Sequence, residues 1–513
     1  MSQAEVTIIK KDATHAKVLC SSDLLFELAD QFTFDVQGAK FSPQFKSGRW
    51  DGKKRLLSTT TKLIYNGLIP ELISYCNDSG YTVDDQTQSP QPKIDYETIE
   101  KFCVALNLHS RGVKIDIRPY QVDAIYQSIL NGRLTLVSPT SSGKSLIIYC
   151  IARWFLLTKQ RILLMVPNLG LIAQMEKDFA DYSSHNGWNS EKYVQTIHGG
   201  KSKTVDKYVT IANWQAIYNV GRGSKKGGQP ADGLSNEWFE QFDLVFCDEV
   251  HLSKATSLTG IMERCTNAHR RFGLTGTLSG IDVDELVIKG LFGHVMQVIT
   301  TSELMDNGDI TKLKMKILHI PYPANVKDLC KKMTYQEELD YIVTNPTRNK
   351  FICNLALSQK QNVLVFFNFK DKQGKILVDM LEEMNNGSKQ ILYIDGDVDI
   401  NDREDIRSLI ATSNNLIVVA SFGTSSTGLN IPNIHSAIFA SPSKSKIRVL
   451  QSIGRLLRLS EGKFICTMYD ILDDLTHKKH KNFFFDWGME RIKYYAEQKF
   501  SYSISKIPEN MVY

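Results

Sequence analysis

The sequence predicts an α/β protein in which two tandem parallel-sheet lobes follow a small α+β domain. The chain has 513 residues, which is too long for one hydrophobic core and indicates two to four domains. Two successive series of short apolar runs alternate with helical patterns, and strands this apolar are typical of parallel sheets covered by helices on both faces. The N-terminal region instead alternates apolar and polar residues, and a polar segment at 84–95 with Pro90 and Pro92 separates it from the rest.

The N-terminal region predicts two strands and one helix. Residues 4–11 and 15–20 alternate with the period of half-buried strands. Residues 21–32 show the period of a helix, and we expect Ser22 or Asp23 to be its N-cap. Mixed elements of this kind favour a small α+β domain.

Ten apolar runs predict the strands of the two lobes. The first series comprises 134–139, 161–167, 207–213, 243–249 and 271–277, and the second comprises 362–368, 391–396, 415–421, 436–442 and 463–470. The Gly- and Lys-rich segment 221–233 predicts a flexible surface loop. The C-terminal segment predicts an amphipathic helix and a tail that pack on the second lobe. The predicted domains are residues 1–90, a first lobe at 95–305, a second lobe at 310–480, and the C-terminal helix and tail at 481–513.

Composition excludes several classes of protein. A hydrophobic content of 42% and a charged content of 23% are ordinary for a folded globular chain. The net charge is only +5, so any nucleic-acid surface must come from local clusters of Lys and Arg. The nine cysteines form no CxxC pair and no zinc spacing, and we expect free thiols in a reducing compartment. No apolar run approaches the ~20 residues of a membrane span, so we expect a cytoplasmic protein without membrane contact.

The string SPTSSGKS at 138–145 has the sequence context of a phosphate-binding loop. It follows an apolar strand and precedes an apolar helix. Backbone N–H groups and a helix N-terminus would hold the phosphates of ATP. Lys144 would reach the β- and γ-phosphates, and the Ser145 hydroxyl would bind Mg²⁺. The nucleotide-binding candidates are Ser138, Pro139, Thr140, Ser141, Ser142, Gly143, Lys144 and Ser145.

Two adjacent carboxylates follow another apolar strand. The string DEVH at 248–251 ends that strand. Two carboxylates at the end of a buried strand cost free energy unless they bind a cation or take part in catalysis. We assign Asp248 to Mg²⁺ and Glu249 to orienting and deprotonating the attacking water. The competing interpretation is a solvated strand end, which the upstream phosphate loop disfavours.

A third string, QSIGRLLR at 451–458, lies in the second series. Arg455 and Arg458 are three residues apart and would share one face if the segment is helical. With Gln451 they suit a surface that faces the γ-phosphate, because arginine supplied across a lobe interface stabilises the transition state. A solvated amphipathic helix face is the alternative. The position of the string, about 200 residues after the acids, favours the functional interpretation.

In this order, the three strings resemble the motif set of superfamily-two helicases and translocases. RPYQ at 118–121 resembles the adenine-recognising glutamine motif, which implies that Gln121 reads the base. Further matches are VPNLGLIAQ at 166–174 to motif Ia, NWQ at 213–215 to motif Ib, LTGT at 274–277 to motif III, VLVFFNF at 363–369 to motif IV and SFGTSSTGLNIP at 421–432 to motif V. The resemblance implies two RecA-like lobes, hydrolysis of ATP with Mg²⁺, and movement along nucleic acid.

A longer string, FSPQFKSGRWDGKKRLL at 41–57, is similar to the amino-terminal domain of the UvsW helicases of tailed phages. This similarity implies a DEVH-box helicase that remodels branched DNA, namely forks, Holliday junctions, R-loops and D-loops, in recombination, repair and replication restart. We also expect a monomer, located in the host cytoplasm if a phage encodes the protein. Ser138 in place of a glycine and Asn213 in place of a threonine depart from the usual motifs. Three alternatives stay open: a double-stranded-DNA translocase that separates no strands, an RNA helicase, and a non-enzymatic DNA-binding scaffold.

Basic residues of the N-terminal region cluster between residues 40 and 62. Seven Lys and Arg residues accompany a single acid, Asp51, and Phe41, Phe45 and Trp50 lie among them. The cations would bind phosphates and the rings would stack on exposed bases, whereas the alternative is that the rings are core. The DNA-contact candidates here are Lys46, Arg49, Lys53, Lys54 and Arg55.

The superfamily resemblance implies further nucleic-acid contacts at the strand-end loops of both lobes. The candidates are Pro167, Asn168 and Gln174 in the first lobe and Asn368, Thr427 and Gly428 in the second. Small polar groups and backbone N–H groups suit phosphates, which predicts binding by structure rather than by base sequence. Lys444, Lys446 and Arg448 either extend this surface or form a solvated charge run.

Overall fold

The computed structural model forms two compact units. It describes residues 4–36, 38–88, 92–218, 234–252, 255–278, 282–395, 400–423, 433–460, 462–478 and 482–512. The first unit comprises residues 1–138 and 143–298, and the second comprises residues 299–513 together with 139–142. The segment 221–233 and the candidates Thr427 and Gly428 lie outside the described residues.

The N-terminal domain is a four-stranded mixed sheet with helices packed against it. Its strand order is β5–β2–β1–β6, with β1 antiparallel to β2, β2 antiparallel to β5, and β1 parallel to β6. The elements are β1 Val6–Lys10, β2 His15–Leu19, α1 Ser22–Gln31, β5 Leu63–Tyr65, the 3-10 helix η2 Asn66–Leu68, α3 Ile69–Asp78 and β6 Val83–Asp85. The predicted α+β character of this domain is confirmed.

Helix α1 is capped by Ser21, so the prediction of Ser22 or Asp23 as the N-cap is wrong. Ser21 has extended backbone angles, and its hydroxyl accepts a hydrogen bond from the Leu24 N–H at 3.4 Å. A capping side chain stands outside the helix, two or three residues before the amide that it satisfies. Asp23 instead lies in the first turn, where its charge interacts favourably with the helix dipole.

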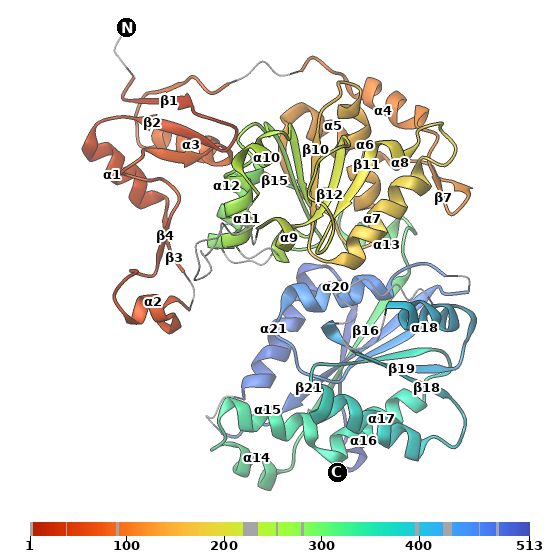
Figure 1. Cartoon of the computed structure of the whole chain (residues 1–513). Helices are drawn as coiled ribbons and strands as arrows, with labels where there is room; N and C mark the ends of the chain where they lie inside the picture. The colour runs from red at the N-terminus through yellow and green to blue at the C-terminus, as the bar shows by residue number, and fades with distance from the viewer. Residues whose placement is uncertain are drawn as a thin grey trace, which may run out of the picture. The chain divides into compact units, whose positions relative to one another are not determined.

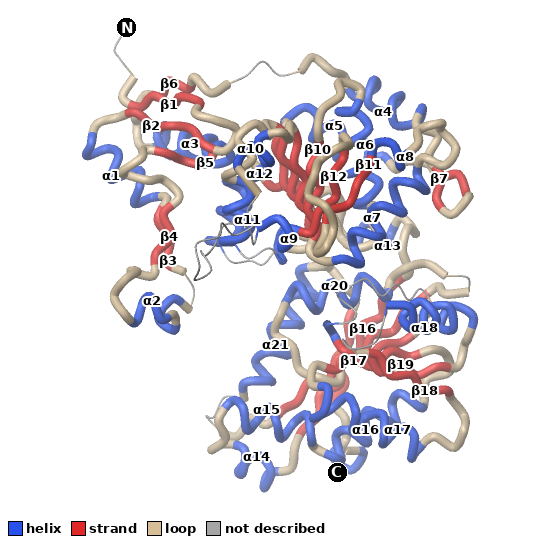
Figure 2. The backbone as a smooth tube through the Cα atoms, in the orientation of Figure 1, coloured by secondary structure: helices blue, strands red, loops and turns tan. Residues whose placement is uncertain are grey.

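A short arm extends from the N-terminal domain, apart from the four-stranded sheet (Figures 1 and 2). Its stem consists of β3 Thr33–Asp35 and β4 Lys53–Arg55, which pair antiparallel. Its tip carries the 3-10 helix η1 Ala39–Phe41 and the short helix α2 Pro43–Lys46. We call residues 33–55 the arm, and it contains most of the predicted basic cluster.

The N-terminal domain and the first lobe share one hydrophobic core. Buried side chains of β1, β2, α1 and α3 belong to the same cluster as those of α11 Ala255–Met262 and α12 Asp282–Phe292. Two glycines allow the closest backbone approach: a Cβ on Gly67 would lie 2.0 Å from the Lys289 carbonyl oxygen, and one on Gly290 would lie 3.0 Å from the Cβ of Tyr65. We call this surface, where Tyr65 and η2 meet α12, the docking interface.

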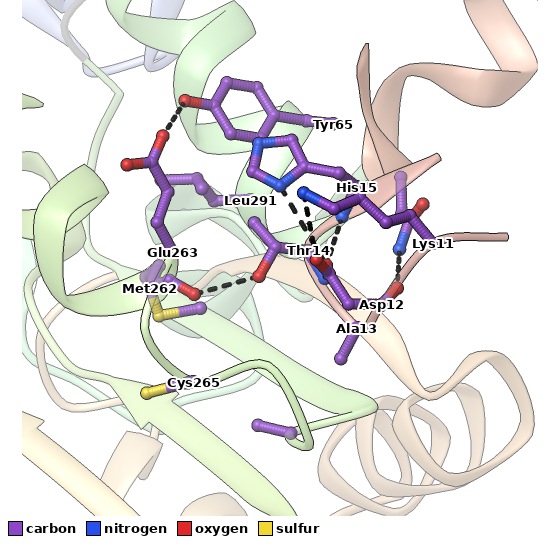
Figure 3. A network of polar contacts seen from close by, with 12 residues as sticks. Lys11, Asp12, Ala13, Thr14, His15, Tyr65, Met262, Glu263, Cys265 and Leu291 are labelled. Atoms are coloured by element: carbon purple, nitrogen blue, oxygen red, sulfur yellow. Dashed lines mark hydrogen bonds and ion pairs between the residues drawn. The ribbon is translucent and has the colours of Figure 1, made fainter. Parts of the chain in front are cut away.

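Polar groups reinforce the packing of the N-terminal domain on the first lobe (Figure 3). The Thr14 hydroxyl donates to the Met262 carbonyl oxygen at 3.0 Å, and the Tyr65 hydroxyl donates to the Glu263 carboxylate at 2.8 Å. The buried guanidinium of Arg271, from the lobe, donates to the Thr14 hydroxyl at 2.7 Å. The shared core and these hydrogen bonds fix the domain on the lobe.

The first lobe is built on a seven-stranded parallel sheet of order β11–β12–β10–β13–β14–β9–β15. The strands are β9 Arg133–Val137, β10 Ile162–Val166, β11 Val194–Ile197, β12 Val209–Asn213, β13 Leu244–Cys247, β14 Arg270–Thr275 and β15 Val295–Gln297. Helices cover both faces, which explains why strands such as β10 are buried along their whole length.

Two groups of helices cover the two faces of this sheet. One face packs on α4 Tyr96–Ala105, α5 Pro119–Asn131, α6 Lys144–Leu156 and α7 Leu169–Tyr182. The other packs on α9 Trp214–Tyr218, α10 Asn236–Glu240, α11 and α12. Short elements complete the lobe: β7 His109–Ser110, β8 Val113–Lys114, α8 Ser190–Tyr193 and the 3-10 helix η3 Val250–Leu252.

The second unit contains another seven-stranded parallel sheet, of order β18–β19–β17–β20–β21–β16–β22. The strands are β16 Lys312–Pro321, β17 Val363–Phe367, β18 Gln390–Ile394, β19 Leu416–Ser421, β20 Ser436–Phe439, β21 Ile465–Asp474 and β22 Tyr502–Lys506. Its helices are α13 Thr301–Asp306, α14 Ala324–Cys330, α15 Tyr335–Thr344, α16 Pro346–Leu357, α17 Lys375–Met384, α18 Ile400–Thr412, α20 Lys446–Leu456 and α21 Phe483–Glu497. The prediction of two parallel-sheet lobes is confirmed.

All ten predicted strands are present, and the sheets contain four that the sequence pattern did not indicate: β11, β15, β16 and β22. The last of these lies in the predicted tail, which adds a parallel edge strand beside β16. All nine cysteines carry free thiols. Among the described helices, none combines the length and apolar character needed to cross a bilayer.

Candidate nucleotide site and nucleic-acid surfaces

The predicted phosphate loop connects β9 to α6. The Ser138 N–H donates to the Thr275 carbonyl oxygen at 2.8 Å, which ties the start of the loop to β14. Gly143 has a φ of +86°, and a Cβ there would lie 2.3 Å from Nε2 of Gln121, so only glycine fits. Ser141 also has a left-handed φ of +72°, and its buried hydroxyl oxygen has no hydrogen-bond partner among the described residues. A strained backbone and a buried hydroxyl without a hydrogen-bond partner are both expected in a loop that binds phosphate.

The other loop candidates lie in the same turn. The Ser142 hydroxyl donates to the Pro139 carbonyl oxygen at 2.6 Å, and Pro139 and Thr140 are half-buried. Ser145 follows Lys144 in the first turn of α6, and its hydroxyl lies 2.8 Å from the hydroxyl of Tyr182.

Lys144 brings the phosphate loop and the DEVH string together. Its Nζ donates to Oε1 of Glu249 at 3.2 Å, and both side chains are largely buried. A Cβ on Gly276, in the LTGT string, would lie 3.5 Å from the same Nζ. Glu249 itself has a left-handed φ of 51°, which is uncommon for a non-glycine residue and typical of functional sites. Three predicted motifs therefore meet at the C-terminal edge of one sheet, where parallel α/β folds bind ligands.

Asp248 sits in an environment that disfavours its charge. Its side chain is only 5% exposed, and burial raises the pKa of the Asp248 carboxyl to about 7, with the neighbouring Glu249 charge adding to the rise. Such a carboxylate gains from a bound cation. The oxygen donors of Asp248 and Ser145 are of the hard type that Mg²⁺ prefers. Where the structure describes the chain, no group of three metal-ligating side chains gathers.

His251 is a site residue that the motif analysis did not single out. Its Nδ1 lies 2.6 Å from the Thr275 hydroxyl and 3.4 Å from Oε2 of Glu249. Burial is the main cause that lowers the pKa of His251, so the neutral imidazole is favoured near pH 7. The Thr275 hydroxyl in turn contacts the Thr277 carbonyl oxygen at 2.8 Å. His251 thus joins the DEVH string to the LTGT string, and the fourth letter of DEVH was the available signal.

Gln121, the predicted base reader, is buried beside the phosphate loop. It is the third residue of α5, and its Oε1 accepts a hydrogen bond from the Arg118 N–H at 3.0 Å. Its Nε2 lies against Gly143. These contacts anchor the start of α5 to the loop, and reading of the adenine base stays a prediction.

The string QSIGRLLR is only partly helical. Gln451 and Arg455 lie four residues apart in α20, on one face and half-buried. Helix α20 ends at Leu456, so Arg458 lies beyond the helix and the condition for a helix face shared with Arg455 is not met. Gly454 and Arg455 sit in the last turn, and Arg458 follows in the segment beyond the helix.

A buried lysine fixes the segment that carries Arg458. Lys463 Nζ donates to the carbonyl oxygens of Leu456 at 2.5 Å and Arg458 at 3.3 Å. The Thr311 hydroxyl also donates to the Arg458 carbonyl oxygen, at 3.2 Å. Burial lowers the pKa of Lys463 to about 8. A cation at the C-terminal carbonyls of a helix is favourable, and this one holds Arg458 in a defined place.

The predicted contacts of the first lobe lie at the end of β10 and on α7. Asn168 is the N-cap of α7 and accepts from the Leu171 N–H at 2.9 Å. The Asn213 side chain donates to the Pro167 carbonyl oxygen at 2.9 Å, so this departure from the usual threonine ties motif Ib to motif Ia. Gln174 is exposed on α7.

The described contact candidates of the second lobe are partly engaged within the lobe. Asn368 accepts from Arg448 Nη1 at 3.0 Å, and its N–H donates to the Ser441 hydroxyl at 2.8 Å. Lys446 pairs with Glu497 at 2.7 Å, which links α20 to α21. Lys444 is exposed.

The basic cluster of the N-terminal region is on the surface of the arm. Lys46, Arg49, Lys53 and Arg55 are exposed and Lys54 is half-buried. Arg55 pairs with Asp51 at 2.5 Å. The alternative that the aromatic rings are core is wrong for Phe41 and Phe45, which are 76% and 38% exposed.

Together, the fold and the site define the class of protein: a two-lobed ATPase of the helicase type, with a docked N-terminal domain. Family models match all three parts. Residues 5–84 match the model described as DNA helicase UvsW, N-terminal; residues 114–280 match type III restriction enzyme, res subunit; and residues 347–460 match the helicase conserved C-terminal domain.

The chain belongs to the UvsW family of ATP-dependent DNA helicases. It is 34% identical over 517 residues to the ATP-dependent DNA helicase uvsW of Enterobacteria phage T4, covering 97% of this chain and 98% of that protein. The crystal structure of T4 UvsW matches with a TM-score of 0.51 at 31% identity, covering 98% of this chain and 99% of that one. The DNA 3'-5' translocase XPB2 of Sulfurisphaera tokodaii is 23% identical over 377 residues, covering 67% of this chain and 79% of that protein.

Proposed function

We propose that this chain uses ATP to remodel branched DNA: reversing forks, migrating Holliday junctions and unwinding R-loops and D-loops in recombination, repair and replication restart. The observation that supports this most is the arm. It presents cations and aromatic rings on a domain that shares its core with an ATP-binding lobe. A DNA-binding element fixed to one lobe can hold one part of a branched molecule while the lobes pull another.

The proposed chemistry begins with Lys144. Lys144 would exchange its bond to Glu249 for the phosphates of ATP, which releases the Glu249 carboxylate to accept a proton from the attacking water. Bound Mg²⁺, held by Asp248 and Ser145, would neutralise charge on the β- and γ-phosphates. Arg455 and Arg458 would stabilise the transition state when the lobes close, with Gln451 beside them.

His251 supports a coupling role for the DEVH string in this proposal. Glu249 and Thr275 both lie within reach of its ring. A change in the position of Glu249 would therefore alter the hydrogen bond to Thr275, in the strand that leads to LTGT. We assign His251 to transmitting the state of the nucleotide site to this strand.

The experiment that tests the proposal is a strand-product assay across matched substrates. End-labelled forks, four-way junctions, R-loops and plain duplexes of equal length are incubated with the protein, ATP and Mg²⁺. We expect strand products from the branched substrates, few from the duplex, and none from the Lys144→Ala variant. Equal rates on plain duplex and branched DNA would refute the preference for branches.

Each alternative predicts a different result in the same assay. A translocase that separates no strands would show DNA-stimulated phosphate release without strand products. An RNA helicase would be stimulated more by RNA than by DNA. A scaffold without enzymatic activity would release no phosphate. Light scattering at working concentrations tests the expectation of a monomer.

A further inference from the structure

We propose that Phe41 is a stacking surface for an unpaired base, so that the arm favours DNA with unpaired nucleotides at a branch point over continuous duplex. This inference rests on the proposed function in one respect, namely that the arm contacts DNA. It adds the chemical feature that the arm recognises.

At the tip of the arm, Phe45 and Trp50 make contacts within the arm, whereas Phe41 lies outside them. A Cβ built on Gly52 would lie 3.0 Å from two ring carbons of Phe45 and 3.1 Å from the Cβ of Ala39, so these three residues form a small contact cluster. The Trp50 ring N–H donates to the Lys53 carbonyl oxygen at 2.8 Å, which ties the tip to the stem. Phe41 is 76% exposed and takes no part in this packing. Its ring is therefore not needed to hold the arm together.

The backbone that presents Phe41 is nevertheless well defined. The Phe41 N–H donates to the Gly38 carbonyl oxygen at 3.0 Å, and the Ser42 N–H donates to the Ala39 carbonyl oxygen at 2.9 Å. The Ser42 hydroxyl then caps α2 by accepting from the Gln44 N–H at 3.2 Å. Phe41 is thus the last residue of η1, one residue before α2 begins, and this defined backbone limits the entropy lost when its ring binds a flat partner.

The charge around the ring indicates a nucleic acid as the partner. Exposed cations flank it in the sequence and on the stem, including Lys40, Lys46 and Lys53. Asp51, the single acid between residues 40 and 62, pairs with Arg55, whose hydrogen bond lowers the pKa of the Asp51 carboxyl to about 2. Phosphates would bind the cations and one base would cover the ring, which is the combination found in single-strand binding surfaces. A protein or membrane partner would need a continuous apolar patch, whereas Phe41, at 76% exposed, and the less exposed Phe45, at 38%, stand among exposed cations.

The arm is tied firmly to the rest of the N-terminal domain. The Leu56 N–H donates to the Phe32 carbonyl oxygen at 2.9 Å, and the Thr33 hydroxyl donates to the Ala29 carbonyl oxygen at 2.6 Å. The domain in turn shares its core with the first lobe. These contacts join the base of the arm to a domain that is packed on the first lobe, so the arm would present Phe41 beside the ATP-binding lobe.

The experiment compares Phe41→Ala with the wild-type full-length protein on two DNAs of equal length and charge. One is a fork with three unpaired nucleotides at the branch, and the other is a continuous duplex. Fluorescence anisotropy gives each dissociation constant, and 2-aminopurine at the unpaired positions reports stacking. We expect Phe41→Ala to weaken fork binding about tenfold, to leave duplex binding unchanged, and to abolish the 2-aminopurine quenching. Phe41→Trp should retain both the affinity and the quenching.

Phe26→Ala is the matched control, because Phe26 is 65% exposed on α1 of the same domain and lies outside the arm. It should bind both DNAs as the wild type does. Unchanged fork affinity and quenching in Phe41→Ala would overturn the proposal, and so would equal losses on fork and duplex. The triple variant K53Q/K54Q/R55Q distinguishes failure of the proposed function from failure of the stacking role of Phe41. If it leaves both affinities unchanged, the arm does not bind DNA and the proposed function loses its main support. If it weakens both while Phe41→Ala has no effect, only the stacking role is wrong.

Discussion

The docking interface offers a sharp test of how the N-terminal domain is held, through the substitution Gly67→Ala. A Cβ at this position would lie 2.0 Å from the carbonyl oxygen of Lys289 and 2.7 Å from that of Gly290. A Cβ atom essentially never comes within 3.0 Å of another heavy atom, so the two backbones must separate by about 1 Å. Neither carbonyl can move aside alone, because both belong to helix α12.

The expected cost follows from what this separation disturbs. Overpacking in a well-packed core costs typically about 1–3 kcal/mol. The same shift strains the contact of Tyr65 with Gly290, its hydrogen bond to Glu263, and the ion pair between Lys289 and Glu71. We therefore expect a loss near the upper end, about 3 kcal/mol, which corresponds to a fall in the melting temperature of roughly 5 °C for a unit of this size.

Thermal unfolding and hydrogen exchange on the full-length protein measure this effect. Amides of η2 and α12 should lose protection in Gly67→Ala, while those of the second lobe should not. Gly199→Ala is the matched control, because a Cβ there would meet no atom within 4 Å. A melting temperature and an exchange pattern equal to those of the control would refute the backbone-contact reasoning.

Three further predictions address the nucleotide site and the second lobe. Lys144→Ala should abolish ATP hydrolysis while leaving the far-ultraviolet circular dichroism spectrum unchanged, and normal turnover would contradict the assignment of the site. Lys463→Met should lower the DNA-stimulated turnover number severalfold with little change in KM for ATP, because the Arg458 segment loses two hydrogen bonds, whereas Lys463→Arg should restore part of it. Glu338 in α15 is buried, and burial raises the pKa of its carboxyl to about 7. Because the folded-state pKa of Glu338 lies above its unfolded value, the contribution of this residue to stability is greatest below about pH 4.5. That contribution is lost as the pH rises to 7, by about 2 kcal/mol after allowance for screening. The melting temperature of Glu338→Gln should therefore fall less than that of the wild type between pH 5 and pH 8, and parallel curves would disprove the assignment.

The central strands of both lobes could be predicted because they are buried on both faces. Strands such as β10 and β17 are apolar at every position, and few other structures explain runs of that kind. Three of the missed strands, β11, β15 and β22, lie at sheet edges, where short length and exposure weaken the pattern. The fourth, β16, alternates charged and apolar residues from Lys312 onward, and that period-two signal was available in the sequence.

Some residues of the candidate site could be assigned from the sequence next to them, and others only from contacts formed on folding. Lys144 and Glu249 could be named because each lies in a short string whose chemistry is local. His251 and Lys463 could not be assigned a role, because the meaning of each depends on partners that only folding brings close. The Ser21 cap shows the same limit at short range, since three neighbouring polar residues are all plausible caps and only the backbone angles decide among them.

Strand β14 links the two parts of the first unit that matter most for the proposed function. At its C-terminal end, Thr275 contacts His251, which in turn contacts Glu249. Near its N-terminal end, the buried Arg271 donates to the Thr14 hydroxyl of the N-terminal domain. A six-residue strand in the centre of a sheet is among the most rigid elements of a protein, so the two ends cannot move independently. The N-terminal domain is thus attached to the strand that carries the LTGT string, and its arm must follow any displacement of that strand as a body.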